Sequence, residues 1–149
     1  NHLDERYDGE TPDILDNAFV VVDYADGSRG MLDLCMFAEA SRNEQEISVV
    51  GDLGKVEALV TEGVVRIGRR ADGARGVVER PVDDPNIQHR GMHHGASYLE
   101  HVAFRDAMLA GRPAAVTLHD GLMSVAVGEA AHRSIELGRP VAMQEVLAP

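Results

Sequence analysis

Three histidines and a tyrosine, close together in the sequence, are the residues best suited to bind a ligand or a metal ion. His89, His93 and His94 precede an expected helix, and Tyr98 falls on its first turn. Imidazoles at this spacing point either to a metal site or to hydrogen bonds with the hydroxyl groups of a polar ligand. No cysteine or carboxylate cluster completes a zinc site, so we expect no metal. The plain alternative, loop histidines bonded to backbone carbonyls, is favoured by residue chemistry alone.

Two helices follow these histidines, and the sequence indicates where each begins and ends. Ser97 with Glu100, and Thr117 with Asp120, have the spacing of a capping box. In that motif each side chain satisfies a backbone N–H that the first helical turn leaves unpaired. A Gly-Arg-Pro sequence then ends each apolar-periodic run, because glycine and proline both stop helices.

Strand patterns occupy most of the chain before the helices, and one more follows them. We expect strands at 18–24, 30–37, 45–50, 55–61, 64–69, 75–80 and 141–146. Short glycine-containing turns join most of them, so neighbours must be antiparallel, because parallel neighbours need a long crossover. The expected fold class is α+β: a largely antiparallel open sheet of about six or seven strands, with the two main helices packed on one face.

The first strand pair is apolar on both faces. Phe19 and Val21 point to one side, while Val20 and Val22 point to the other. A sheet that is apolar on both faces must be covered on both. If the two helices cover one face, a second copy of the chain is the simplest cover for the other.

The composition restricts the class of partner. The chain of 149 residues has a formal net charge of −11, from 25 acidic against 14 basic residues. Without a basic stripe, this argues against nucleic acid and anionic membrane surfaces. No apolar run approaches the roughly 20 residues of a membrane span, and no signal peptide is visible. A single cysteine, Cys35, excludes an internal disulfide and suits a reducing cytoplasm; its apolar strand predicts a buried, inert thiol.

The domain organisation and the missing motifs limit what the chain does alone. Residues 1–149 are expected to form a single domain, with 1–15 a loop or the remnant of a preceding segment. There is no G-x-G-x-x-G after a strand and no P-loop, so no cofactor-binding residue is expected in this chain. The sequence 51–54, Gly-Asp-Leu-Gly, is interpreted as a hairpin turn.

Four motifs in a fixed order carry a resemblance to a known family. They are D-N-A-F-V-V-V-D-Y-A-D-G, V-V-G-D-L-G-K-V-E-A, H-G-A-S-Y-x-E-H-x-x-F-R-D-A, and V-T-L-H-D-G-L-M-S-V-A-V-G-E-A-A-H-R-S-I-E-L-G-R-P-V. Together they resemble the C-terminal domain of the Gfo/Idh/MocA oxidoreductases, the glucose–fructose oxidoreductase and inositol dehydrogenase group. The resemblance covers about residues 16–146, and its specificity lies in the last motif and in the order of all four.

The resemblance implies that the chain is the substrate-binding and oligomerisation half of a longer enzyme. An N-terminal Rossmann domain would bind NAD or NADP. The whole enzyme would oxidise or reduce a hydroxyl or keto group of a sugar, cyclitol or related polyol. Family members form dimers or tetramers through the open sheet face, so a homodimer or tetramer is expected. No cofactor is expected on this chain alone.

The resemblance also assigns residues. The family's catalytic Lys, and its helix with a catalytic Asp and His, belong to the N-terminal part, so no catalytic residue is expected here and the chain alone should be inactive. Placing that pair at His2 and Asp4 fails, because the spacing differs and too few residues remain before the first strand. His94, Tyr98 and the adjoining His93 are the expected substrate contacts.

Two other functions remain open at this point. The chain could be a non-enzymatic oligomerisation or scaffold domain that keeps the fold without the chemistry. It could also be a metal-dependent hydrolase that uses the three histidines, in which case a chelator should abolish its activity.

Overall fold

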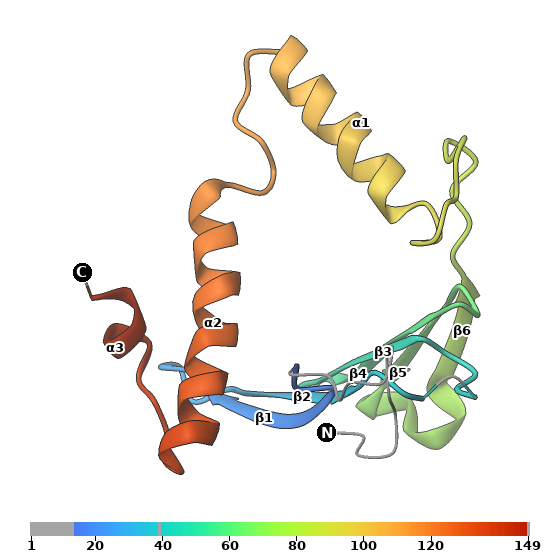
Figure 1. Cartoon of the computed structure of the whole chain (residues 1–149). Coiled ribbons are helices and arrows are strands. Elements are labelled where there is room, and N and C mark those ends of the chain that lie inside the picture. The colour runs from blue at the N-terminus through green and yellow to red at the C-terminus, as the bar shows by residue number, and fades with distance from the viewer. Residues whose placement is uncertain (1–13, 39, 149) are drawn as a thin grey trace. The chain divides into compact units, whose positions relative to one another are not determined.

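The computed structural model describes residues 14–38 and 40–148. Residues 1–13, expected as a loop and including His2 and Asp4, lie outside the described part. The chain divides into two units (Figure 1). The first unit combines the stretch up to Ala40 with the stretch from Leu122 onward, and the second unit is Ser41–Gly121.

The first unit contains a β-hairpin and most of a long helix. Strands β1 (Asn17–Asp23) and β2 (Arg29–Cys35) pair antiparallel. The connecting turn is held by Asp26, whose carboxylate accepts hydrogen bonds from the Ser28 backbone N–H at 2.9 Å and hydroxyl at 2.7 Å. The sequence prediction of a hairpin at this Asp-Gly turn is therefore confirmed.

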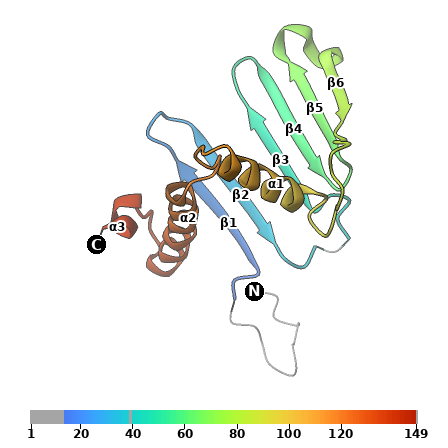
Figure 2. The same ribbon diagram turned by 90° about the horizontal axis from the view of Figure 1, so that it is seen from above.

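Helix α2 (Leu118–Leu137) lies beside β1 (Figure 1; Figure 2). Its small residues Ala126 and Ala130, one helical turn apart, are buried at 4% and 9% exposure. Small side chains on one stripe allow another backbone to approach closely, which agrees with a helix face that packs in the interior.

The predicted capping box at the start of α2 is confirmed. The Asp120 carboxylate accepts hydrogen bonds from the Thr117 backbone N–H at 2.8 Å and hydroxyl at 2.7 Å. The Asp120 backbone N–H in turn donates to the Thr117 hydroxyl at 3.2 Å. These bonds from Thr117 lower the pKa of the Asp120 carboxyl, since they stabilise its charged form.

The β1–β2 hairpin leaves large apolar side chains open. Phe19 is 77% exposed and Met31 is 73% exposed. Both project from the same face, because Phe19 pairs with Asp33, which lies two residues from Met31 on β2. Cys35, expected to be buried, is exposed and free. The prediction of a buried thiol is wrong, because every residue of β2 except the half-buried Gly30 is exposed.

The second unit is a four-stranded antiparallel meander followed by a helix. The strands are β3 (Gln45–Val50), β4 (Gly54–Val60), β5 (Val64–Arg69) and β6 (Val77–Pro81), with the 3-10 helix η1 (Arg70–Gly76) before β6. Their order in the sheet is β3-β4-β5-β6. The α+β class and the meander are confirmed. The six described strands form two sheets, whereas the sequence predicted a single open one; the packing of both helices on one face stays a prediction.

One face of the meander is charged. Glu57 lies opposite Arg66, and Arg66 lies opposite Glu79 on the next strand. The Arg66 Nε donates to Glu79 at 2.9 Å, and this bond raises the pKa of the Arg66 guanidinium. Because side chains alternate along a strand, the opposite face carries the apolar residues Ile47, Val56 and Ile67.

Helix α1 (Ala96–Leu109) begins before the position that the sequence indicates. Gly95 is its N-cap, with φ of 97°, so Ser97 lies inside the first turn and is not the cap. The Ser97 hydroxyl pairs instead with the His93 ring, at 2.9 Å. The predicted capping box is wrong here because a glycine in a left-handed conformation turns the chain into the helix earlier.

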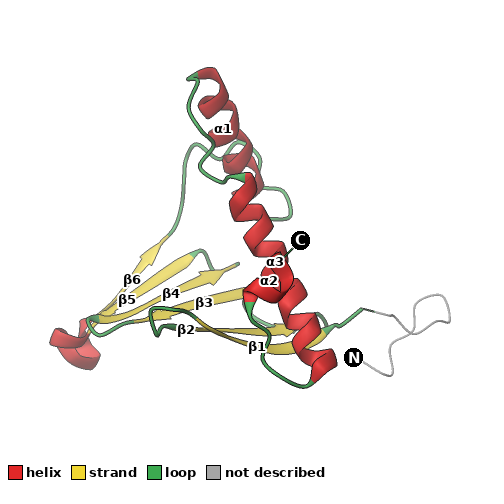
Figure 3. Ribbon diagram, turned by 90° about the vertical axis from the view of Figure 1, so that its left-hand side faces the viewer, coloured by secondary structure: helices red, strands yellow, loops and turns green. Residues whose placement is uncertain are grey.

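The predicted last strand at 141–146 is also wrong, because this segment forms the short helix α3 (Met143–Leu147; Figure 3). The Glu145 carboxylate accepts hydrogen bonds from the Ala142 backbone N–H at 2.8 Å and from Arg139 at 2.8 Å. Arg133 of α2 donates to the Glu145 carbonyl oxygen at 3.0 Å. These contacts satisfy backbone groups locally, so the segment needs no partner strand.

The Glu145 contacts predict how α3 responds to acid. The Arg139 hydrogen bond, followed by that from Ala142, lowers the pKa of Glu145 from 4.5 to about 2. Because the folded-state pKa lies below the ordinary one, the stabilisation is fully present above pH 4.5 and is lost as the pH falls toward 2. A carboxyl titration followed by NMR should place the Glu145 midpoint near 2. The Arg139→Gln variant should move the midpoint upward; an unchanged midpoint in that variant would contradict the assignment.

No helix in residues 14–38 and 40–148 is long and apolar enough to cross a membrane.

Candidate functional site

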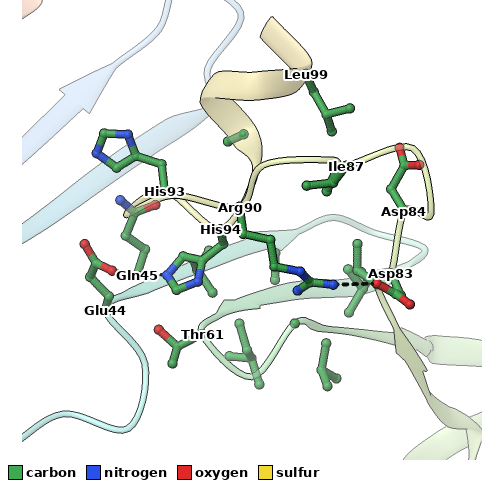
Figure 4. Close-up of a pocket in the computed structure, with 18 of the residues that line it drawn as sticks. Glu44, Gln45, Thr61, Asp83, Asp84, Ile87, Arg90, His93, His94 and Leu99 are labelled. Carbon is green, nitrogen blue, oxygen red and sulfur yellow. Dashed lines mark hydrogen bonds and ion pairs between the residues drawn. The ribbon is translucent and has the colours of Figure 1, made fainter.

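A pocket of about 840 Å³ opens within the second unit (Figure 4). Its walls come from the start of β3, the β4–β5 turn, the loop after β6 and the first turn of α1. All of its lining residues belong to Ser41–Gly121. The pocket is therefore complete within one unit of the chain.

Local hydrogen bonds hold the walls together. The Gly63 backbone N–H donates to the Leu59 carbonyl at 3.0 Å and closes the β4–β5 turn. The Val82 N–H donates to the Gly63 carbonyl at 2.7 Å, which ties the loop after β6 to that turn. Asn43, buried at 9% exposure, accepts from the Glu62 N–H at 3.2 Å. These bonds tie the loop after β6 and Asn43, which precedes the rim residue Glu44, to the β4–β5 turn.

Two of the predicted contact residues, His93 and His94, line the pocket. His93 Nδ1 lies 2.9 Å from the Ser97 hydroxyl. His94 Nε2 lies 3.4 Å from the Glu44 carboxylate, and Figure 4 shows the His94 ring near Glu44. These rings contact polar side chains and not backbone carbonyls, so the plain alternative does not describe them. Two imidazoles with polar partners on a pocket wall are suited to hydrogen bonding with a ligand's hydroxyl groups.

The third predicted contact, Tyr98, is not among the pocket-lining residues. Its ring packs edge-on against His89, with 5.7 Å between the ring centroids and 69° between the planes. The structure thus separates the four residues into a His93–His94 pair at the pocket and a His89–Tyr98 pair. Contact between Tyr98 and substrate stays a prediction.

Several charged residues of the pocket rim lie outside the motifs that the sequence indicates. Glu44 contacts His94 from fifty positions away in the chain, and no local pattern indicates this pairing. Asp83 and Arg90 form an ion pair at 2.9 Å (Figure 4). The sequence gives a general indication for Asp83 and Arg90, because they belong to the polar loop before α1 and loops on a rigid scaffold often hold functional sites.

Backbone strain is concentrated at this pocket. Among the described residues, the non-glycine positions with positive φ are Thr61 at 89° and His94 at 53°. Both line the pocket. A β-branched residue in this region is a real outlier, and such strain is typically retained at functional sites. The strained pair therefore supports a functional role for this pocket.

The lining of the pocket is suited to a polar ligand. In the part of the chain that the structure describes, no three His, Cys, Asp or Glu side chains are placed to hold a metal ion. Apolar side chains such as Leu59, Ile87 and Leu99 alternate in the lining with carboxylates and imidazoles. A ring with a carbon skeleton and several hydroxyl groups would meet both kinds of surface.

Comparisons with known proteins agree with this fold. The family model described as "Oxidoreductase family, C-terminal alpha/beta domain" matches residues 2–143. Among solved structures, an oxidoreductase from Agrobacterium radiobacter in complex with NAD+, L-tartaric acid and magnesium is similar, with a TM-score of 0.69 and 17% identity over 89% of this chain. This chain spans 39% of that protein. No curated protein matches.

At this identity, the solved structure shows the fold alone. The family match is stronger evidence, because it covers almost the whole chain from residue 2 to residue 143. The chain belongs to the Gfo/Idh/MocA oxidoreductase family, and it represents that family's C-terminal alpha/beta domain.

Proposed function

We propose that this chain is the substrate-binding and oligomerisation half of an NAD(P)-dependent oxidoreductase that acts on a hydroxyl or keto group of a sugar, cyclitol or related polyol. The observation that carries the proposal is the strained pocket lined by His93 and His94 in a domain of this family. The similar oxidoreductase from Agrobacterium radiobacter holds NAD+, which supports a nicotinamide cofactor for the whole enzyme.

The residues of this chain do not themselves fit a nicotinamide cofactor. The glycine-containing segment 51–54 joins the antiparallel strands β3 and β4, whereas a dinucleotide cradle joins a strand to a helix. NAD or NADP would therefore be held by another part of the enzyme. The role of this chain is to bind and orient the substrate, with the imidazoles of His93 and His94 at its hydroxyl groups.

The exposed apolar face of the β1–β2 hairpin supports the oligomerisation role. Phe19 and Met31 expose apolar surface that a homodimer or tetramer would bury. A cytoplasmic setting suits the free, exposed thiol of Cys35, which a reducing environment keeps unpaired. The alternative, a scaffold domain without chemistry, shares this apolar face but needs no ligand pocket.

Binding of a neutral polyol to the isolated chain tests the proposal. Titration with myo-inositol, followed by NMR, should shift the ring signals of His93 and His94. The His94→Ala variant should weaken binding about fivefold, because it removes one hydrogen bond worth about 1 kcal/mol. His132→Ala on α2, outside the pocket, is the matched control and should bind normally. If myo-inositol shifts no signal of the chain, the scaffold function is favoured instead.

A further inference from the structure

The lining of the pocket carries an excess of negative charge. It contains the carboxylates of Glu44, Asp83, Asp84 and Glu100, and the guanidinium of Arg90. Figure 4 shows Glu44 and Asp84 on opposite sides of the pocket. A ligand inside would therefore meet carboxylates from more than one direction. Like charges placed together are unfavourable, and the exclusion of water by a ligand strengthens the effect.

The single arginine of the lining does not offset this excess. Arg90 Nη2 is already paired with Asp83 at 2.9 Å, so its charge is shared with a carboxylate of the same wall. His94 lies 3.4 Å from Glu44, and protonation of His94 would at most neutralise that one carboxylate. Asp84 and Glu100 form no ion pair among the described residues, although Asp84 Oδ1 accepts hydrogen bonds from the backbone and side-chain N–H groups of Asn86.

The N-terminus of α1 attracts an anionic ligand, but this attraction is weaker than the repulsion by the carboxylates. The start of a helix carries about half a positive charge, which favours anions. Here the first turn lines the pocket through Ala96 and Ser97, and Glu100 lies on the next turn of the same helix. The full negative charge of the Glu100 carboxylate is larger than the partial positive charge of the helix end. The net field in the pocket remains unfavourable to an anion.

We infer that this pocket selects neutral polyhydroxylated substrates and rejects their carboxylated counterparts, with Glu44 and Glu100 as specificity-determining residues. The inference rests on the proposed function and goes further, because it fixes the charge class of the substrate. Carboxylates reject an anionic ligand, yet they accept hydrogen bonds from hydroxyl groups, and such charge-assisted bonds are strong. The same side chains thus favour neutral polyhydroxylated ligands and exclude carboxylated ones.

D-glucose and D-glucuronate form a matched pair of probes, because they share a ring and differ by one carboxylate. NMR titrations of the chain at low salt should give a dissociation constant at least about tenfold lower for D-glucose. Added salt should reduce this ratio, since it screens charges on an open pocket. In the double variant Glu44→Gln/Glu100→Gln the ratio should fall to about threefold or less.

The double variant Glu129→Gln/Glu136→Gln is the control. It removes the same number of charges from α2, outside the pocket, and should leave the ratio unchanged. Equal or tighter binding of D-glucuronate would overturn the inference while leaving the proposed function in place. A tenfold ratio that persists in Glu44→Gln/Glu100→Gln would overturn the assignment to these residues. If neither sugar shifts any pocket signal, the proposed function itself fails.

Discussion

Replacing Gly54 by alanine should destabilise the second unit severely, by about 3 kcal/mol or more. Gly54 begins β4 and lies opposite Arg69 of β5. A Cβ atom at this position would overlap the carbonyl oxygen of Gly68 and lie 3.1 Å from the Gly68 carbonyl carbon. These are backbone atoms of the adjacent strand, so relief of the overlap requires the β4–β5 pairing to open.

Gly51, at the other end of the same turn, provides the control. A Cβ atom at Gly51 would meet nothing within 4 Å. Urea denaturation of both variants should show a large loss for Gly54→Ala and a change within about 0.5 kcal/mol for Gly51→Ala. Similar midpoints for the two variants would show that β4 and β5 do not approach as closely as described. The pocket would be lost with the sheet, since β4 and β5 supply its floor.

Replacing Gly95 by alanine should damage both stability and ligand binding. Gly95 is buried at the start of α1 with φ of 97°, and its added Cβ would lie 2.6 Å from Cγ2 of Ile87. Overpacking of this kind costs about 1–3 kcal/mol. The left-handed conformation adds about 1–2 kcal/mol for a residue with a side chain. Because Ile87 and Ala96 line the pocket, the displacement should also weaken polyol binding.

Two further variants separate the conformational cost of Gly95→Ala from its steric cost. Gly91 has φ of 56° and open space around its Cβ position, so Gly91→Ala should show the conformational cost without the steric one. In the Ile87→Ala background, Gly95→Ala should cost no more than Gly91→Ala does, because the overlapping side-chain atoms are gone. The double-mutant cycle measures this coupling directly. A cost for Gly95→Ala that is the same in both backgrounds would rule out contact with Ile87.

These variants are relevant to function because they test which contacts maintain the shape of the pocket. The pocket is formed by residues from four separate segments, and few of its side chains are anchored by more than one bond. Its shape therefore also depends on close packing, such as that of the Ile87 side chain against the backbone of Gly95. Substitutions at His94 should change binding alone, whereas those at Gly54 and Gly95 should change stability as well.

Features that depend on neighbouring residues could be predicted from the sequence. The Asp26 turn and the Thr117–Asp120 capping box form within two or three positions of the chain. The meander follows from short turns, which leave antiparallel pairing as the sterically available choice. The family was also identifiable, because its motifs occur in a fixed order along the chain.

Features that depend on particular side-chain contacts, or on the conformation of one glycine, could not be predicted in this way. The segment 141–146 has a strand-like pattern, but hydrogen bonds from Arg133 and Arg139 to Glu145 stabilise a helix there. Helix α1 begins before the predicted N-cap Ser97, because Gly95 takes a left-handed conformation and is itself the N-cap. Tyr98 pairs with His89, although its spacing placed it beside His94.

The sequence by itself determined the fold class, the family and the two histidines at the pocket. The tertiary structure alone decided that His94 meets Glu44, that Thr61 and His94 both take strained conformations at the pocket, and that carboxylates outnumber arginines in the lining. The physical reason is the range of the interactions. Turns and caps are satisfied within a few residues, whereas the charge of a pocket is the sum over segments that only folding brings together.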